Sequence, residues 1–236
     1  MSGTALSVRG LSAGYGNSDA LRTVDLEVSR EQITAVVGPN GAGKSTLMKV
    51  LAGIHAPRGG TVHLFGEDIT THDPRKRLAA GLSLCPERRR IFPGMTVEEN
   101  LLLGAVTVRP RIARARVEET YDRVPWLRER RRSIGGNLSG GQQQILAILR
   151  AIMTAPSLLL LDEPSLGLSP RVVLEVAGLI RDLAADDMTV VIVEQNVSLG
   201  LKLAEQVHVL NQGEIIHRGT AQELTENTDL VSAYLG

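Results

Sequence analysis

The sequence predicts an α/β fold: a buried parallel sheet flanked by helices, with an N-terminal antiparallel β layer and an inserted α-helical subdomain. Three observations predict it. The apolar, β-branched run at 33–37 is followed by a glycine-rich loop and a helix-spaced segment at 46–51. Two further apolar runs, at 158–161 and 189–193, flank a helical pattern and so form a β-α-β unit. Between these two parts the pattern from 87 to 149 is helical.

The remaining elements follow from the same periodicities and from turn residues such as Gly59 and Gly60. In chain order we expect strands at 6–8, 24–28, 33–37 and 61–65, helices at 98–103, 112–124 and 142–151, the strand 158–161, the helix 171–184, the strand 189–193, a hairpin of 207–210 with 214–217, and a short helix. No repeat, low-complexity tract or long linker interrupts the chain. We therefore expect one domain over 1–236, with a helical subdomain at about 87–150 inserted in it.

Residues 38–46 form the most informative run of the chain. They fit G-x-x-x-x-G-K-[ST], the P-loop that wraps nucleotide phosphates, and they stand between a strand and a helix as that motif requires. Backbone N–H groups at the helix N-terminus can then meet phosphate oxygens, Lys44 can reach the β- and γ-phosphates, and the Ser45 hydroxyl can ligate Mg²⁺. The expected nucleotide-binding residues are Gly38, Pro39, Asn40, Gly41, Ala42, Gly43, Lys44, Ser45 and Thr46.

A second part of the site follows the apolar run Leu158–Leu161, which ends in Asp162 and Glu163, the Walker B pattern. A buried parallel strand that ends in carboxylates places them at the carboxyl edge of the sheet, where the P-loop also lies. We expect Asp162 to hold Mg²⁺, directly or through water, and Glu163 to polarise the attacking water. Lys44 and Glu163 are thus expected to act in catalysis.

A second glycine loop, Ser139, Gly140, Gly141 and Gln142, opens the helix at 142–151. A serine hydroxyl and backbone amides at a helix N-terminus can again meet phosphate. Alone, the sequence Ser-Gly-Gly would be no more than a helix cap. One chain does not need two phosphate loops for one nucleotide, so we interpret them as serving different nucleotides, as when two domains pair head to tail.

The ordered set of motifs resembles the ATP-binding cassette (ABC) ATPases over essentially the whole chain: the P-loop, Leu-Ser-Gly-Gly-Gln at 138–142, the Walker B run, and Ser165-Leu166-Gly167-Leu168 after it. The resemblance implies a P-loop NTPase fold of the ABC ATPase type, ATP and Mg²⁺ as cofactors, and ATP hydrolysis. It also implies that Tyr15 stacks on adenine and that residues 165–168 link two sites across a head-to-tail dimer. In such a dimer the loop 139–142 of one chain covers the ATP on the other.

Two positions depart from the general ABC pattern. Glu87 stands where most members have a glutamine that contacts Mg²⁺. The sequence Glu194-Gln195-Asn196 stands where most members have Thr-His-Asp, so Gln195 replaces the switch histidine. We expect Glu87 to bind metal and Gln195 to take the catalytic place of the histidine. Because a neutral amide cannot carry imidazolium charge, we expect this chain's own ATP site to turn over slowly.

Residues 86–101 and 193–196 together resemble one branch, the LivF-like second ATPases of branched-chain amino acid importers, although Arg88 stands where the branch often has glycine. The resemblance implies uptake of branched-chain or related hydrophobic amino acids. It implies as partners a second, LivG-like ATPase or a second copy of this chain, two transmembrane permease subunits and, indirectly, a periplasmic binding protein. The implied location is peripheral, on the cytoplasmic face of the membrane. Urea and short-amide importers have very similar second ATPases and remain an alternative.

Composition limits the other function classes. The 236 residues carry zero formal net charge, 3% aromatics and a single cysteine, Cys85, so we expect no disulfide. Residues 1–10 are polar and the apolar run at 158–161 is too short to span a bilayer, so we expect no signal peptide and no membrane span. The chain stops 74 residues after Asp162, so we expect no further C-terminal domain. Between 88 and 132, twelve arginines face six acids; this excess is either a solvated helical face or a surface for anionic lipid or an acidic partner. This arginine excess is the only feature that favours an alternative function class, a soluble ABC ATPase acting on nucleic acid or ribosomes. We expect no nucleic-acid partner, since base-stacking side chains are scarce. A third class is a non-hydrolysing regulatory subunit, which the altered switch position Gln195 favours. The intact catalytic acid Glu163 argues against this class.

Phe92 and Met95 are large apolar residues beside Pro93 and Gly94, which is unusual for a solvated loop. They either pack inside the helical subdomain or line a groove that receives a cytoplasmic helix of a membrane subunit.

Overall fold

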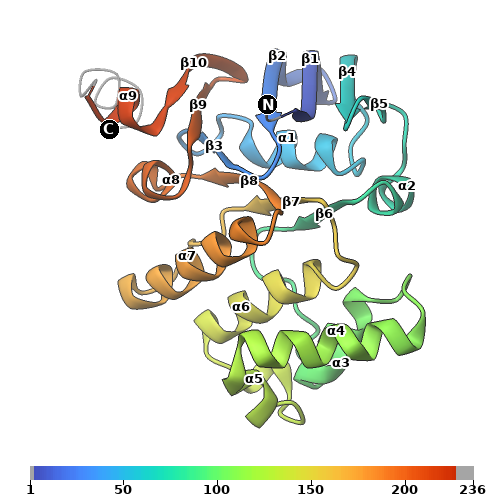
Figure 1. The fold of residues 1–236 in the computed structure, drawn as a ribbon. Helices are drawn as coiled ribbons and strands as arrows, with labels where there is room; N and C mark the ends of the chain where they lie inside the picture. The colour runs from blue at the N-terminus through green and yellow to red at the C-terminus, as the bar shows by residue number, and fades with distance from the viewer. Residues whose placement is uncertain (1–2, 227–236) are drawn as a thin grey trace.

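The computed structural model describes residues 3–226, and over that range the chain forms two sheets with helices between and below them (Figure 1). The first sheet is the predicted antiparallel layer, with the order β2-β1-β4-β5. Its strands are β1 (Thr4–Tyr15), β2 (Ser18–Ser29), β4 (Gly59–Leu64) and β5 (Glu67–Asp68). Bulges in β1 let both long strands bend while their apolar side chains keep facing inward.

The second sheet carries the site, with the order β10-β9-β3-β8-β7-β6. It is parallel from β9 to β6 and closes with the antiparallel β9–β10 hairpin. The strands are β3 (Ile33–Val37), β6 (Leu82–Cys85), β7 (Leu158–Asp162), β8 (Thr189–Glu194), β9 (Gln206–Asn211) and β10 (Glu214–Thr220). The strand β8 lies between β3, which leads into the P-loop, and β7, which ends at Asp162.

Both faces of this sheet are buried, which explains the unbroken apolar runs in its strands. Alternate residues of β7 enter different cores: Leu159 and Leu161 pack with α6 (Gly140–Ala151) and α7 (Pro170–Ala185), whereas Leu158 and Leu160 pack with α1 (Lys44–Leu51). Helix α1 is thus enclosed between the two sheets (Figure 1). Burial on two sides holds the helix that begins at the P-loop in one place.

The helices of the middle segment lie on the far side of the central sheet from the antiparallel layer (Figure 1). They are α3 (Val97–Gly104), α4 (Pro110–Arg123) and α5 (Pro125–Glu129), followed by a 3₁₀ turn (Gly135–Asn137) and α6. A capping box between Thr96 and Glu99 begins α3, and Pro110 begins α4. Among residues 3–226, none of the helices combines the length and apolarity needed to cross a bilayer.

The predicted strands and helices are confirmed with shifts of a few residues, the strands of the antiparallel layer being longer than expected. Sequence reasoning missed α2 (Pro74–Ala79), α5, α8 (Val197–Leu203) and the short strands β5 and β6. The last six described residues form α9 (Ala221–Glu226), the expected short helix. Helix α8 contains Gly200, where a Cβ would lie 2.7 Å from Val37, so glycine lets this helix pack directly on β3.

Candidate nucleotide-binding site

The P-loop has the geometry that its glycines predict. Gly41 and Gly43 have φ of 81° and 108°, and a Cβ on Gly43 would lie 2.5 Å from the carbonyl oxygen of Ala20. Only glycine fits there. Gly43 is also the N-cap of α1 and supplies no side-chain acceptor, and the first turn of the helix contains no acidic residue. The N–H groups of this turn are therefore available to an anion.

Lys44 is buried, with 4% of its surface exposed, and its ammonium is held by three oxygens. Nζ donates to the carbonyls of Gly38 (2.8 Å) and Pro39 (3.0 Å) and forms an ion pair with Oε1 of Glu163 at 3.1 Å. The ammonium thus lies at the mouth of the P-loop with a carboxylate opposite. A phosphate that enters competes with Glu163 for this charge.

Asp162 and Ser45 form the candidate metal position. Ser45 Oγ donates to Asp162 Oδ1 at 3.2 Å, and Asp162 is 6% exposed. Burial raises the pKa of Asp162 to about 6; the bond from Ser45 opposes this shift, and the charges of Glu163 and Glu87 add to it. A hydroxyl and carboxylates are hard oxygen ligands, so these residues fit Mg²⁺, which would lower the cost of ionised Asp162 and link it to phosphate oxygens.

We predict that Asp162→Asn stabilises the nucleotide-free chain and weakens its binding of Mg²⁺-ATP. The pKa of Asp162 in the folded chain, about 6, lies above its usual 3.8, so this group lowers the free energy of unfolding as pH rises from about 4 to 6. At pH 8 removal of the charge should add about 2 kcal/mol. Urea unfolding at pH 8, with Asp182→Asn as the exposed control, checks the first part. An Asp162→Asn chain that is less stable than the wild type would contradict the prediction.

Other predicted residues share this cavity of about 470 Å³. P-loop residues line it together with Glu87, Glu163 and Gln195, which come from the ends of β6, β7 and β8. Glu163 has a φ of 47° and donates its backbone N–H to Val193 O (2.9 Å). Glu87, 30% exposed at its side chain, pairs with Arg88 Nε at 3.2 Å. The structure therefore brings the predicted phosphate, metal and catalytic residues of one chain together.

Among the predicted residues, Asp162 and the P-loop residues Gly38, Pro39 and Ala42 do not line this cavity, and neither do the loop 139–142 and Tyr15. Ser139 caps α6 by accepting from Gln142 N, and Gln142 in turn accepts from Ser139 N, so the loop is a capping box that begins α6. Tyr15 is 49% exposed and stacks on His55 with ring centroids 4.6 Å apart. One face of its ring is thus covered by a neighbouring ring.

Sequence reasoning missed several residues of the site. Arg88 lines the cavity, and it has a φ of 65°, followed by 62° at Arg89 and 42° at Arg90. The left-handed conformation favours glycine, which explains why glycine suits position 88 in the resembled branch. Leu166, expected only as part of the segment 165–168 that links two sites across a dimer, is 46% exposed and also lines the cavity. Glu194 is fully covered at the end of β8, and no sequence pattern marked it for a role.

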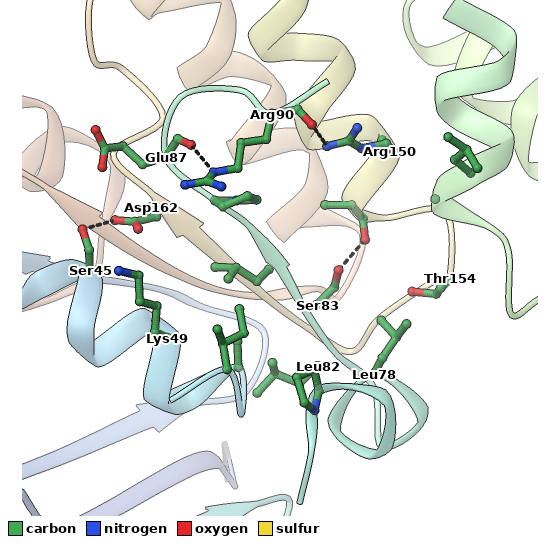
Figure 2. Close-up of a pocket in the computed structure, with 18 of the residues that line it drawn as sticks. Ser45, Lys49, Leu78, Leu82, Ser83, Glu87, Arg90, Arg150, Thr154 and Asp162 are labelled. Carbon is green, nitrogen blue, oxygen red and sulfur yellow. Dashed lines mark hydrogen bonds between the residues drawn. The ribbon is translucent and has the colours of Figure 1, made fainter. Parts of the chain in front are cut away.

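A separate groove of about 520 Å³ runs beside the nucleotide cavity, between α1 and α2 on one side and α3 and α6 on the other. Figure 2 shows Ser45, Asp162 and Glu87 at one end and Leu78, Leu82 and Thr154 toward the other. Arg150 lines this groove. Its Nη2 donates to Arg90 O at 2.7 Å, and its Cζ lies 5.3 Å from the centroid of the Phe92 ring. Phe92, 49% exposed, lines the groove, whereas Met95 does not.

A strand–glycine loop–helix with a buried lysine, and an acidic pair at the end of a nearby parallel strand, define the class of P-loop nucleoside triphosphatases. Comparison with known proteins narrows the class, because the family described as ABC transporter matches residues 21–166. The chain belongs to the ABC transporter family and is an ATP-binding ATP hydrolase. The predicted family, fold class and enzymatic activity are confirmed.

Relatives match this chain over nearly its full length. It is 38% identical to the high-affinity branched-chain amino acid transport ATP-binding protein BraG of Pseudomonas aeruginosa, covering 98% of this chain and 99% of that one. It is 37% identical to the probable branched-chain amino acid transport ATP-binding protein LivF of Archaeoglobus fulgidus, with 96% of each covered. Its structure is similar to the ADP conformation of MJ1267, an ATP-binding cassette of an ABC transporter, with a TM-score of 0.85, 28% identity, and 95% and 94% of the chains covered.

Proposed function

We propose that this chain is an ATP-hydrolysing subunit of an importer for branched-chain or related hydrophobic amino acids. The observation that carries the proposal is its similarity, over nearly the whole length of both chains, to proteins named for branched-chain amino acid transport. The segments 86–101 and 193–196 support the LivF-like branch. Urea or short amides are the second candidate substrate class. The chain would work at the cytoplasmic face of the membrane as a single domain with a helical subdomain at 87–150.

The proposed roles of the residues follow the geometry. Lys44 would neutralise the phosphates, Ser45 and Asp162 would hold Mg²⁺ with Glu87 beside them, and Glu163 would polarise water while Gln195 donates to the γ-phosphate. Mg²⁺ would supply charge neutralisation between the phosphates. The exposed face of the Tyr15 ring would stack on adenine.

The capping-box loop Ser139–Gln142 would serve a second nucleotide, held by the P-loop of a head-to-tail partner. The lining of the cavity of its own chain supports this role, because that lining does not include Ser139, Gly140, Gly141 or Gln142. The partner would be a LivG-like ATPase or a second copy of this chain.

The groove of Figure 2 would receive a cytoplasmic helix of the permease. It is largely apolar, with Leu78, Leu84 and Leu103 on its walls and the half-exposed ring of Phe92 at its rim. An apolar groove of this kind suits the apolar face of an amphipathic helix. Two permease subunits would then be driven by the two cassettes, with a periplasmic binding protein delivering the solute to them.

We expect Phe92→Ser to uncouple ATP hydrolysis from transport while ATP affinity changes less than about twofold. The side chain lies on the groove and not in the nucleotide cavity, so its loss removes the docking contact and the contact with Arg150 but no contact to nucleotide. Solute uptake and ATP hydrolysis are measured in the same proteoliposomes. Ile112→Ser, at a similarly exposed apolar position on α4, is the control. If affinity and folding collapse together, Phe92 acts as a core residue instead.

Co-purification of the tagged chain from its native membranes tests the whole proposal. A second cassette ATPase and two polytopic proteins in the purified complex would support the importer, and a bound solute-binding protein would then report the substrate. Ribosomes or nucleic acid without a membrane subunit would overturn it and would turn attention to the arginine-rich segment 88–132.

A further inference from the structure

Glu194 is a buried acid to which the mechanism above gives no role. It is the last residue of β8 and is 2% exposed. Within residues 3–226 its carboxylate forms no ion pair; its donors are the backbone N–H groups of Ser165 and Asn196. Burial raises the pKa of Glu194, and the bonds from Ser165 and Asn196 oppose the shift. A buried, unpaired carboxylate lowers stability unless hydrogen bonds compensate, so its presence at this point needs a reason.

The contacts of Glu194 reach the three loops of the site. Its Oε1 accepts from Ser165 N at 3.0 Å, in the loop after β7. Its Oε2 accepts from Asn196 N at 3.5 Å, in the loop after β8. Its backbone carbonyl accepts from Gly38 N at 3.3 Å, where the P-loop leaves β3. This arrangement is possible because β8 lies between β3 and β7.

Each of these contacts lies next to a residue with a proposed role. Ser165 is two residues after Glu163, whose backbone is in the left-handed region at a φ of 47°. Asn196 follows Gln195 and is the N-cap of α8, its Oδ1 accepting from Leu199 N. Because a non-glycine residue disfavours positive φ, neighbouring hydrogen bonds are needed to hold Glu163 there.

We propose that Glu194 is a positioning residue that holds Glu163 and Gln195 at a fixed spacing around the γ-phosphate by bridging the loops that follow β7 and β8. The inference rests on the proposed roles of Glu163 and Gln195. A carboxylate can perform this bridging because both of its oxygens accept. A glutamine can accept with only one oxygen and would set its NH₂ group against the second backbone N–H.

The first test is kinetic and uses the complex that co-purifies with the full chain. In Glu194→Gln we expect kcat for ATP hydrolysis to fall about tenfold, while the KM for ATP stays within about twofold. The matched control is Glu205→Gln, whose carboxylate also accepts a backbone N–H, from Ile33 at 2.7 Å, but at the opposite end of β3. That variant should keep the wild-type kcat.

A double-mutant cycle separates positioning from general damage. Added to Gln195→Ala, Glu194→Gln should cost less in kcat than the roughly tenfold that it costs in the wild type, because one of the two positioned residues is already absent. A fully additive loss would overturn the inference, as would a Glu194→Gln variant with wild-type kcat. Glu194→Thr, the residue of most family members, replaces Glu194→Gln if the amide variant fails to fold; there too a wild-type kcat would overturn it.

The second test does not depend on hydrolysis. Hydrogen–deuterium exchange of the full chain should become about tenfold faster at 163–166 and 195–196 in Glu194→Gln, and stay unchanged in β9. Unchanged exchange at both loops would overturn the bridging role. An inactive wild-type chain would contradict the proposed function, while this exchange measurement would still decide the role of Glu194.

Discussion

Glu163→Gln will nearly abolish ATP hydrolysis at the site built on this chain's P-loop, lowering its single-turnover rate by about 100-fold or more. The reason is chemical. The side chain of Glu163 is 9% exposed at the cavity wall, and the amide fills the same space but cannot accept a proton from water. ATP affinity should hold or rise, because the carboxylate no longer competes with phosphate for Nζ of Lys44, 3.1 Å away. Single-turnover hydrolysis and nucleotide binding are measured on the same preparation.

The control and the comparison with the partner sharpen this result. Glu214→Gln, on the exposed β9–β10 turn, should leave both rates unchanged. In a complex with a different ATPase, Glu163→Gln should slow steady-state hydrolysis less than the matching change in the partner, since Gln195 and Glu87 make this chain's site the slower one. Equal losses in both cassettes would count against the asymmetry, and a Glu163→Gln site that turns over at the wild-type rate would count against its catalytic role.

Arg77→Met will destabilise the chain by about 4 kcal/mol, the largest stability loss we expect from one substitution. Arg77 is 1% exposed, and its guanidinium donates to four backbone carbonyls. Nη1 meets Val50 O and Leu51 O, both at 2.7 Å, while Nη2 meets Thr70 O and Nε meets His72 O, both at 2.9 Å. Methionine would fill most of the volume but supply no donor to these carbonyls, of which Val50 O would keep its bond from Gly53 N at 3.0 Å.

The carbonyls of Val50 and Leu51 lie at the C-terminus of α1, where helix geometry leaves acceptors free and where the helix dipole favours a cation. Urea unfolding measures the loss, and thermal unfolding should show a midpoint lower by about 10 °C. Arg75 is an exposed arginine on α2, the helix that also contains Arg77, and Arg75→Met should change the free energy of unfolding by less than about 0.5 kcal/mol. An Arg77→Met chain within about 1 kcal/mol of the wild type would contradict this account.

Strong local patterns allowed most of the fold to be predicted. The runs 33–37, 158–161 and 189–193 are apolar because both faces of their sheet are buried, and that alone distinguishes them from surface strands. The missed elements lack such a pattern. Strand β6 is four residues long, and α8 contains Gly200, whose role depends on the approach of Val37 from β3. Contacts between distant segments, which a local pattern does not contain, decide both.

The site divides in the same way. The P-loop and the Asp162–Glu163 pair could be predicted because phosphate and metal chemistry demand these residue types at one sheet edge. Arg77 and Glu194 could not, because each acts on backbone atoms supplied by other segments: α1 for Arg77 and the loop after β7 for Glu194. A charged residue within a run of ordinary helix or strand carries no local sign that it will be buried.

The groove and the nucleotide cavity have a common wall, since Ser45 and Glu87 line both. A message between the two sites therefore needs no relay through the protein: an occupant of either site touches residues that the other also uses. Ser45, the proposed metal ligand, and Lys49, which lines the groove but not the cavity, lie one turn apart on α1. Under the proposed roles, a nucleotide in the cavity and a permease helix in the groove would affect each other by steric contact at these shared side chains.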